Sequence, residues 1–246
     1  MFENAQENLP IVNHARIHAL KAHLTDSQLK EVIEIYLSEA KVIHLKLIQA
    51  LYNEDWLLAS NLFHQWKGAA LSIGLDRLGN WLQVQENCAN KLPFLELLDI
   101  LSNLITKTNF ELSEYLPPSQ LIPMKKILIA EDSLAIQKLT KNIFQNQGFE
   151  ITTARNGEQV LEIMKEETFD AILLDIVMPV LDGITTAKRI RDLEANPGDL
   201  PLIAITGNPN NYTEHEYFEF GFDRVMQKPI NFDVLLKWVI ELTHSD

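Results

Sequence analysis

Five polar side chains in the second half of the sequence follow short apolar runs or end them. These residues are Glu131, Asp132, Asp175, Thr206 and Lys228. If the apolar runs are neighbouring strands of a parallel sheet, the polar side chains surround one crevice at the carboxyl ends of those strands. Three carboxylates gathered there would repel one another unless a divalent cation neutralised them, and Mg²⁺ prefers such oxygen ligands. We therefore expect a magnesium site formed by Glu131, Asp132 and Asp175.

The chemistry that this set predicts is phosphoryl transfer. Asp175 is the expected nucleophile, because a carboxylate can form an aspartyl phosphate by in-line displacement. Lys228 supplies a positive charge for a phosphoryl oxygen, and Thr206 supplies a hydroxyl donor. The alternative is a doubly wound fold whose strand-end acids are only solvated. A dehalogenase-type phosphatase is excluded, because it needs a second aspartate two residues after the first and this chain has Val177 there.

A second reactive side chain, His64, lies in the first half of the sequence. On a helix, Lys67 and Gly68 follow it by three and four residues and share its face, and Leu71 extends that face with an apolar contact. A neutral imidazole can attack phosphorus through a ring nitrogen. Lys67 can offset the charge of a phosphoryl group, and Gly68 leaves room for a partner to dock over the ring. Trp66 points away from this face and is expected in the core.

The first half of the sequence reads as helices. Thr25 and Gln28 form a capping-box pattern, and apolar residues then recur at three- and four-residue spacing over residues 29–47. Further helices are expected over the segments 56–73, 78–89 and 95–105, with a shorter one at 15–22. Four main amphipathic helices with short connections predict an antiparallel bundle.

In the second half the periodicity changes. Short apolar runs alternate with helical patterns five times, which predicts a doubly wound sheet of five parallel strands. The proline-rich stretch between the halves cannot extend a helix and marks a linker. We therefore expect a helical bundle over residues 1–116, a linker over 117–123 and an α/β domain over 124–246.

Composition limits the classes of function. The net charge is −13 and no cluster of Lys and Arg appears, so no nucleic-acid partner is expected. Cys88 is the single cysteine, which excludes an internal disulfide and a cysteine-based metal site. No secretory signal and no membrane-spanning run is present, which predicts a cytoplasmic protein without membrane insertion. No nucleotide-binding glycine loop appears, so we expect no kinase activity from this chain alone and do not class it as an enzyme.

Residues 124–246 resemble the response-regulator receiver family. The resemblance rests on Glu131 and Asp132 after the first strand, the segment 173–179 around Asp175, Asp182-Gly183, the segment 205–207 and the segment 227–229. It implies a five-stranded flavodoxin-like sheet. It also implies that Glu131, Asp132 and Asp175 bind Mg²⁺ together with the backbone carbonyl of Val177, and that the peptide bond before Pro229 is cis. The chain departs from the family at Val225, where an aromatic residue is usual. Switching through that aromatic residue is therefore in doubt, whereas phosphoryl chemistry is not.

Residues 10–116 resemble the histidine-containing phosphotransfer (HPt) domain. His64, Lys67, Gly68 and Gly74 match the signature of that family at its spacing. The resemblance implies that His64 carries a phosphoryl group and exchanges it with receiver domains. The other histidines lack this context and are expected to be structural or surface residues.

Together these patterns predict a phosphoryl carrier in a multistep two-component phosphorelay. Its expected partners are a sensor histidine kinase and other receiver or HPt proteins. Two alternatives remain open. Phosphorylation of Asp175 could drive dimerisation or partner binding without any relay through His64, or the chain could be the C-terminal part of a hybrid histidine kinase. The sequence leaves open whether His64 and Asp175 exchange phosphate within one chain.

Overall fold

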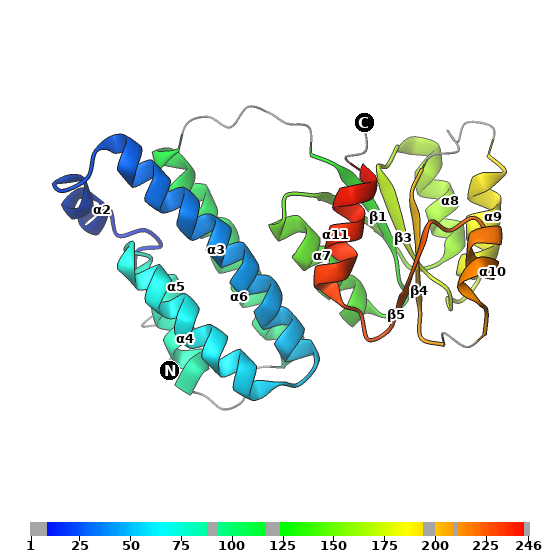
Figure 1. Ribbon diagram of the computed structural model, residues 1–246, viewed down its shortest axis with the longest axis horizontal. Coiled ribbons are helices and arrows are strands. Elements are labelled where there is room, and N and C mark those ends of the chain that lie inside the picture. The colour runs from blue at the N-terminus through cyan, green and yellow to red at the C-terminus, as the bar shows by residue number, and fades with distance from the viewer. Residues whose placement is uncertain (1–8, 88–92, 117–123, 194–199, 209–210, 244–246) are drawn as a thin grey trace. The chain divides into compact units, whose positions relative to one another are not determined.

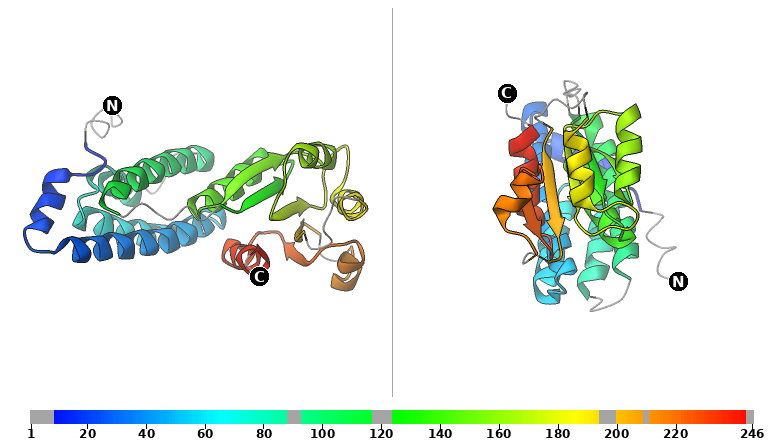
Figure 2. Two further views of the ribbon diagram at one scale, coloured as in Figure 1. Left: turned by 90° about the horizontal axis from the view of Figure 1, so that it is seen from above. Right: turned by 90° about the vertical axis from the view of Figure 1, so that its right-hand side faces the viewer.

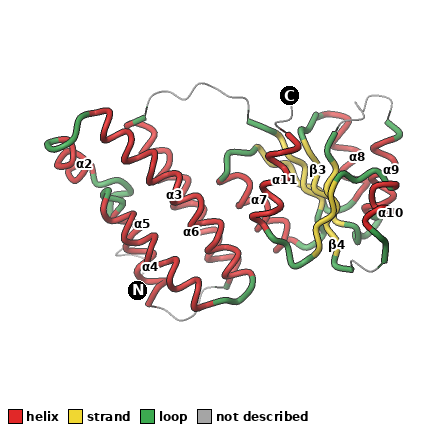
Figure 3. The backbone as a smooth tube through the Cα atoms, viewed as in Figure 1, coloured by secondary structure: helices red, strands yellow, loops and turns green. Residues whose placement is uncertain are grey.

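A computed structural model of the chain describes residues 9–87, 93–116, 124–193, 200–208 and 211–243. The chain divides into two compact units, Met1–Ile122 and Pro123–Asp246. The first is helical, and the second combines helices with a sheet (Figures 1 and 3). The predicted linker, 117–123, lies outside the described residues.

Helices account for all the regular structure in the described part of the first unit. They are α2 (His14–Lys21), α3 (Asp26–Tyr52), α4 (Trp56–Ser72), α5 (Asp76–Asn87) and α6 (Phe94–Leu112), which a 3-10 turn, Ser113–Tyr115, follows. The predicted capping box at the start of α3 is confirmed. The Gln28 side chain accepts a hydrogen bond from the backbone amide of Thr25, and the Thr25 hydroxyl accepts one from the backbone amide of Gln28. Asp55 caps α4 by accepting a hydrogen bond from the amide of Leu58.

Trp66 lies at the centre of the helical core. It is 1% exposed, and its indole N–H donates to the hydroxyl of Tyr36 at 3.2 Å. The ring of His44 lies 5.7 Å away, and burial lowers the pKa of that imidazole to about 4. Trp66 therefore points into the bundle, as its position on the helix predicts, and His64 is left on the outer side of α4.

The second unit alternates strands and helices without interruption. Its elements are β1 (Lys126–Ala130), α7 (Leu134–Asn146), β2 (Glu150–Ala154), α8 (Gly157–Glu166), β3 (Ala171–Asp175), α9 (Gly183–Arg191), β4 (Leu202–Thr206), α10 (Glu214–Glu219), β5 (Arg224–Gln227) and α11 (Phe232–Thr243). The sheet is parallel with strand order β2-β1-β3-β4-β5. Helices α7 and α11 cover one face, and α8, α9 and α10 cover the other (Figures 1 and 2). This is the predicted flavodoxin-like fold.

The strand order determines which residues meet. Strands β1 and β3 are neighbours at the centre of the sheet, and every residue of β3 is buried. Helices on both faces explain why these strands read as continuous apolar runs rather than as alternating patterns. The carboxyl ends of β1, β3, β4 and β5 lie at one edge, where the predicted polar residues follow them. In the described part of the chain, no helix is both long and apolar enough to cross a membrane.

Gly183, the first residue of α9, packs directly against the end of β3. A Cβ at this position would lie 2.2 Å from the carbonyl oxygen of Asp175 and 2.9 Å from the Cα of Ile176. Both contacts are with backbone, so they cannot be relieved by a side-chain rotation. The glycine is therefore required for α9 to begin where it does.

We expect Gly183→Ala to destabilise the second unit by about 1–3 kcal/mol, because the added methyl group overpacks the end of β3. Gly207→Ala is the matched control: nothing lies within 4 Å of the Cβ it would add, so its effect should stay within about 0.5 kcal/mol. Urea unfolding, followed by hydrogen exchange of peptides from β3, measures the change in the free energy of unfolding in both variants. Equal stability of the two variants would contradict this packing.

Candidate functional site

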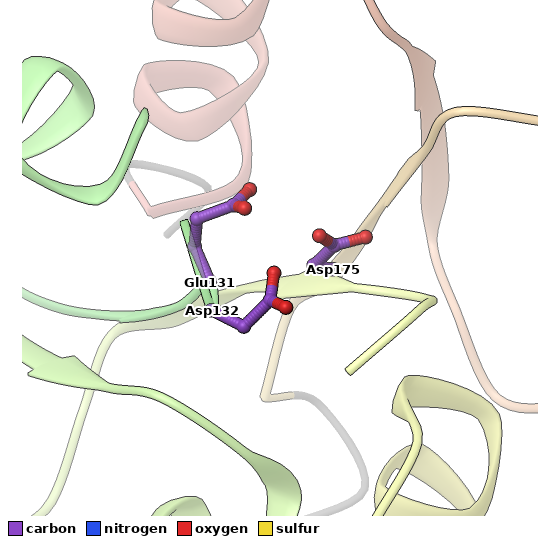
Figure 4. Close-up of side chains that lie close together, drawn as sticks. All are labelled: Glu131, Asp132 and Asp175. Carbon is purple, nitrogen blue, oxygen red and sulfur yellow. The ribbon is translucent and has the colours of Figure 1, made fainter. Parts of the chain in front are cut away.

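Three carboxylates gather at the ends of β1 and β3. Each of Glu131, Asp132 and Asp175 places an oxygen within 4.8 Å of the others. Figure 4 shows these three side chains close together. Glu131 and Asp175 are each 3% exposed, whereas Asp132 is exposed. Within the described residues this is the one group of three or more acidic, His or Cys side chains close enough to share a metal ion. Oxygen ligands of this kind suit Mg²⁺.

Lys228 joins the two buried carboxylates. Its Nζ lies 2.8 Å from Oε2 of Glu131 and 2.7 Å from Oδ2 of Asp175. Burial is the largest effect on Glu131 and raises the pKa of its carboxyl to about 7, although the hydrogen bond from Lys228 acts in the opposite direction. Burial also lowers the pKa of Lys228, but its hydrogen bonds to Asp175 and Glu131 outweigh this and hold the pKa above its ordinary value. The ammonium therefore stays charged.

Backbone groups orient the same side chains. The amide of Val177 donates to Oδ1 of Asp175 at 3.1 Å, and the amide of Ser133 donates to Oε1 of Glu131 at 3.2 Å. The amide of Lys228 donates to the carbonyl of Thr206 at 2.8 Å, which fixes the end of β5 beside the end of β4. The peptide bond between Lys228 and Pro229 is cis, as the resemblance to receivers implies. Asp175 is thus held at both carboxylate oxygens.

Thr206 lies at the same edge of the sheet. It is 2% exposed, and its hydroxyl oxygen accepts a hydrogen bond from the amide of Asn208 at 3.2 Å. Its predicted contact is with a phosphoryl oxygen, which this structure does not test. Val225, at the position where receivers usually have an aromatic residue, is partly buried and packs against the core on the α8–α10 face.

His64 has its own carboxylate and lysine. The imidazole side chain is 69% exposed, and its Nδ1 lies 2.7 Å from Oε1 of Glu86 on α5. The other oxygen of Glu86 lies 2.6 Å from Nζ of Lys67. The hydrogen bond from Lys67, followed by that from His64, lowers the pKa of the Glu86 carboxyl, so this group is ionised and can only accept. His64 must then donate from Nδ1, so Nε2 carries the lone pair, and within the described residues Nε2 has no hydrogen-bond partner.

Glu86 is the residue that sequence reasoning missed. It lies within the helix expected over residues 78–89, but nothing in the local spacing around His64 points to it. The short turn after α4 makes α5 antiparallel to it, and this pairing brings residue 86 opposite residue 64. The signal available in the sequence was this turn, together with an acidic residue near the end of the next helix.

The remaining predicted residues of the helical site lie as follows. Gly68 is exposed, and a Cβ placed on it would meet nothing within 4 Å, so the surface beside His64 is open. Leu71 is partly buried and lies over Gly79 of α5. It therefore packs α4 against α5 in addition to extending the face that His64 shares.

Comparisons with known proteins identify the second unit. Residues 127–240 match the family of response regulator receiver domains. Over 119 residues the chain is 40% identical to hybrid signal transduction histidine kinase I of Dictyostelium discoideum, a match that covers 46% of this chain and 7% of that protein. Over 106 residues it is 33% identical to the transcriptional regulatory protein SrrA of Staphylococcus aureus, covering 43% of this chain and 42% of that protein. The chain thus spans less than half the length of these relatives.

Solved receiver structures also match. One is the receiver domain of a sensor histidine kinase from Pseudomonas aeruginosa, with a magnesium ion coordinated in its active-site cleft (27% identity, TM-score 0.46, 50% of this chain and 99% of that one). Another is a response regulator from Thermotoga maritima in complex with Mg²⁺ and BeF (33% identity, TM-score 0.43, 48% and 99%). On the family match, the C-terminal half of this chain belongs to the response regulator receiver family. It is homologous to the receivers of hybrid histidine kinases.

In the helical unit, we expect Lys67→Met to raise the pKa of Glu86 towards its ordinary value, because the hydrogen bond from Lys67 is the largest effect that lowers it. A carboxyl whose pKa is lowered by folding stabilises the folded state above its unfolded pKa, and this stability is lost as the pH falls through the folded pKa. The loss of stability in acid should therefore be smaller in the variant and complete at a higher pH, because the folded pKa of Glu86 then lies closer to the unfolded value. A carbon-detected NMR titration of the Glu86 carboxyl checks this, with Lys46→Met on exposed α3 surface as the control. An unchanged Glu86 titration in Lys67→Met would refute the assignment.

Proposed function

We propose that this chain is a phosphoryl carrier in a multistep two-component phosphorelay, in which phosphate moves between His64 and aspartates of receiver domains. The observation that carries the proposal is the state of His64. Its imidazole is exposed, its Nδ1 contacts Glu86, and no residue in the described part of the chain binds its Nε2. The same chain contains a receiver domain. We further propose that the helical unit functions as an HPt domain.

Transfer to His64 from an aspartyl phosphate follows from these positions. The lone pair of Nε2 attacks phosphorus, the bond between phosphorus and the carboxylate oxygen breaks, and the carboxylate leaves with that electron pair. The proton on Nδ1 stays in place, so the ring becomes cationic as the new bond forms. Glu86 accepts from Nδ1 at 2.7 Å and offsets this charge. The Nζ of Lys67 lies 2.6 Å from the other oxygen of Glu86, and from this position it can donate to an oxygen of the phosphoryl group on the ring.

Transfer to the receiver is the reverse step at Asp175. A carboxylate oxygen of Asp175 attacks the phosphorus of a phosphohistidine, and the imidazole nitrogen leaves with the electrons of the broken bond. Lys228, already 2.7 Å from Asp175, donates to a phosphoryl oxygen, and Thr206 supplies a hydroxyl at the same edge. Glu131, Asp132, Asp175 and the carbonyl of Val177 would hold Mg²⁺, which when bound neutralises the charge of the clustered carboxylates and of the phosphoryl group.

A second candidate is favoured by the comparisons. The match to hybrid signal transduction histidine kinase I covers 7% of that protein, so the receiver there is one part of a much longer kinase chain. On this proposal the chain acts within, or alongside, a kinase that supplies the phosphoryl group. The sensor kinase and other receivers or HPt proteins are its proposed partners in either case, and the chain itself is not a kinase.

The test is phosphorylation with Mg²⁺ and labelled acetyl phosphate, followed by measurement of the label's stability to acid and base. We expect base-labile label on Asp175 that is lost in Asp175→Asn, and acid-labile label on His64 that is lost in both His64→Gln and Asp175→Asn. His18→Gln, which changes an exposed histidine on α2, is the matched control and should keep both kinds of label.

Two results would contradict the proposal. Base-labile label without any acid-labile label would show a receiver that acts without relay through His64, as in a phosphorylation-dependent interaction module. Absence of label in every variant would show that the carboxylate cluster does not accept phosphate from this donor.

A further inference from the structure

Gly79 is the fourth residue of α5, and a glycine inside a helix is a poor helix former and needs a packing reason. The reason is Leu71 on α4. A Cβ on Gly79 would lie 2.4 Å from Cδ2 and 2.5 Å from Cγ of Leu71. The leucine side chain therefore rests directly on the backbone of α5, and the two helices approach closely at this point.

The contact between Leu71 and Gly79 belongs to the same helix pair as the contact between His64 and Glu86. The turn that joins α4 and α5 contains Gly74 with φ of +84°, and Leu75 donates to the carbonyl of Ala70 at 2.9 Å. Because the helices are antiparallel, moving seven residues back along α4 from Leu71 and seven residues forward along α5 from Gly79 leads to His64 and Glu86. Seven residues are about two helical turns, or about 10.5 Å along each axis.

We propose that Gly79 is a positioning residue for His64. By allowing Leu71 to lie on the α5 backbone, it sets the spacing of α4 and α5 that keeps Glu86 at 2.7 Å from Nδ1 of His64. Hydrogen bonds weaken steeply when their distance increases, so a larger side chain at position 79 uncouples the imidazole from its carboxylate. The contact between Phe63 and Trp81, with ring centroids 6.3 Å apart, keeps α5 on the bundle when this spacing changes. The inference rests on the proposed function of His64, but the geometry can be measured without a phosphodonor.

The test is a size swap read by nitrogen NMR of the His64 ring, whose shifts report which nitrogen carries the proton. We compare wild type, Gly79→Val, Leu71→Ala and the double variant, with Glu86→Gln as the reference for a lost carboxylate. Valine is a better helix former than glycine, so any loss in Gly79→Val comes from packing. We expect Gly79→Val to give a ring spectrum like that of Glu86→Gln, and the double variant to return to the spectrum of Leu71→Ala, because removal of the leucine side chain makes room.

The rate of phosphotransfer to His64 should fall roughly tenfold in Gly79→Val, the effect of losing one hydrogen bond to a charged group, and should recover in the double variant to the rate of Leu71→Ala. If Gly79→Val does not fold, as circular dichroism would show, Gly79→Ala should give a smaller change in the same direction. A wild-type ring spectrum in folded Gly79→Val, or no recovery in the double variant, would overturn the inference. If the spectra change as expected but wild type accepts no phosphate, the proposed function fails and the positioning role of Gly79 stands.

Discussion

In each unit the proposed phosphoryl acceptor depends on a lysine that neutralises a carboxylate. In the receiver, Lys228 bonds both Glu131 and Asp175, which are almost fully buried and would otherwise repel each other. Removing one partner from such a buried group typically costs about 3–5 kcal/mol, because a buried charge is left without compensation. The site therefore requires the end of β5 to lie at the same edge as the ends of β1 and β3, and the parallel sheet with strand order β2-β1-β3-β4-β5 satisfies this requirement.

The helical unit uses the same pairing for a different purpose. Lys67 and Glu86 form an ion pair at the surface of the helical unit beside the exposed His64, and ion pairs that solvent can reach contribute little to stability. What the pair provides is orientation. Lys67 keeps Glu86 ionised, Glu86 keeps the proton of His64 on Nδ1, and the other ring nitrogen is left with its lone pair. Stability in this unit comes instead from the core around Trp66, on the opposite side of α4.

The receiver could be predicted from the sequence because its site lies at strand ends. Each buried strand reads as an apolar run, and the polar residue that follows it is placed by the fold itself, so Glu131, Asp132, Asp175 and Lys228 were found together. The hydroxyl of Thr206 is placed at the expected edge, but its partner, the amide of Asn208, depends on a loop conformation that no residue pattern specifies. Glu86 and Gly79 were missed for a related reason: their importance comes from the pairing of two helices, and neither lies within one turn of His64.

The central claim is that Asp175, rather than its carboxylate neighbours, accepts the phosphoryl group. The most direct measurement is reduction with borohydride after treatment with acetyl phosphate and Mg²⁺, followed by peptide mass spectrometry, because reduction converts an aspartyl phosphate to homoserine. Both oxygens of Asp175 are held, one by Lys228 and one by the amide of Val177, whereas Asp132 is exposed. We expect homoserine at position 175 alone, and only when Mg²⁺ is present. Reduction at Glu131 or Asp132 with Asp175 unmodified would contradict it.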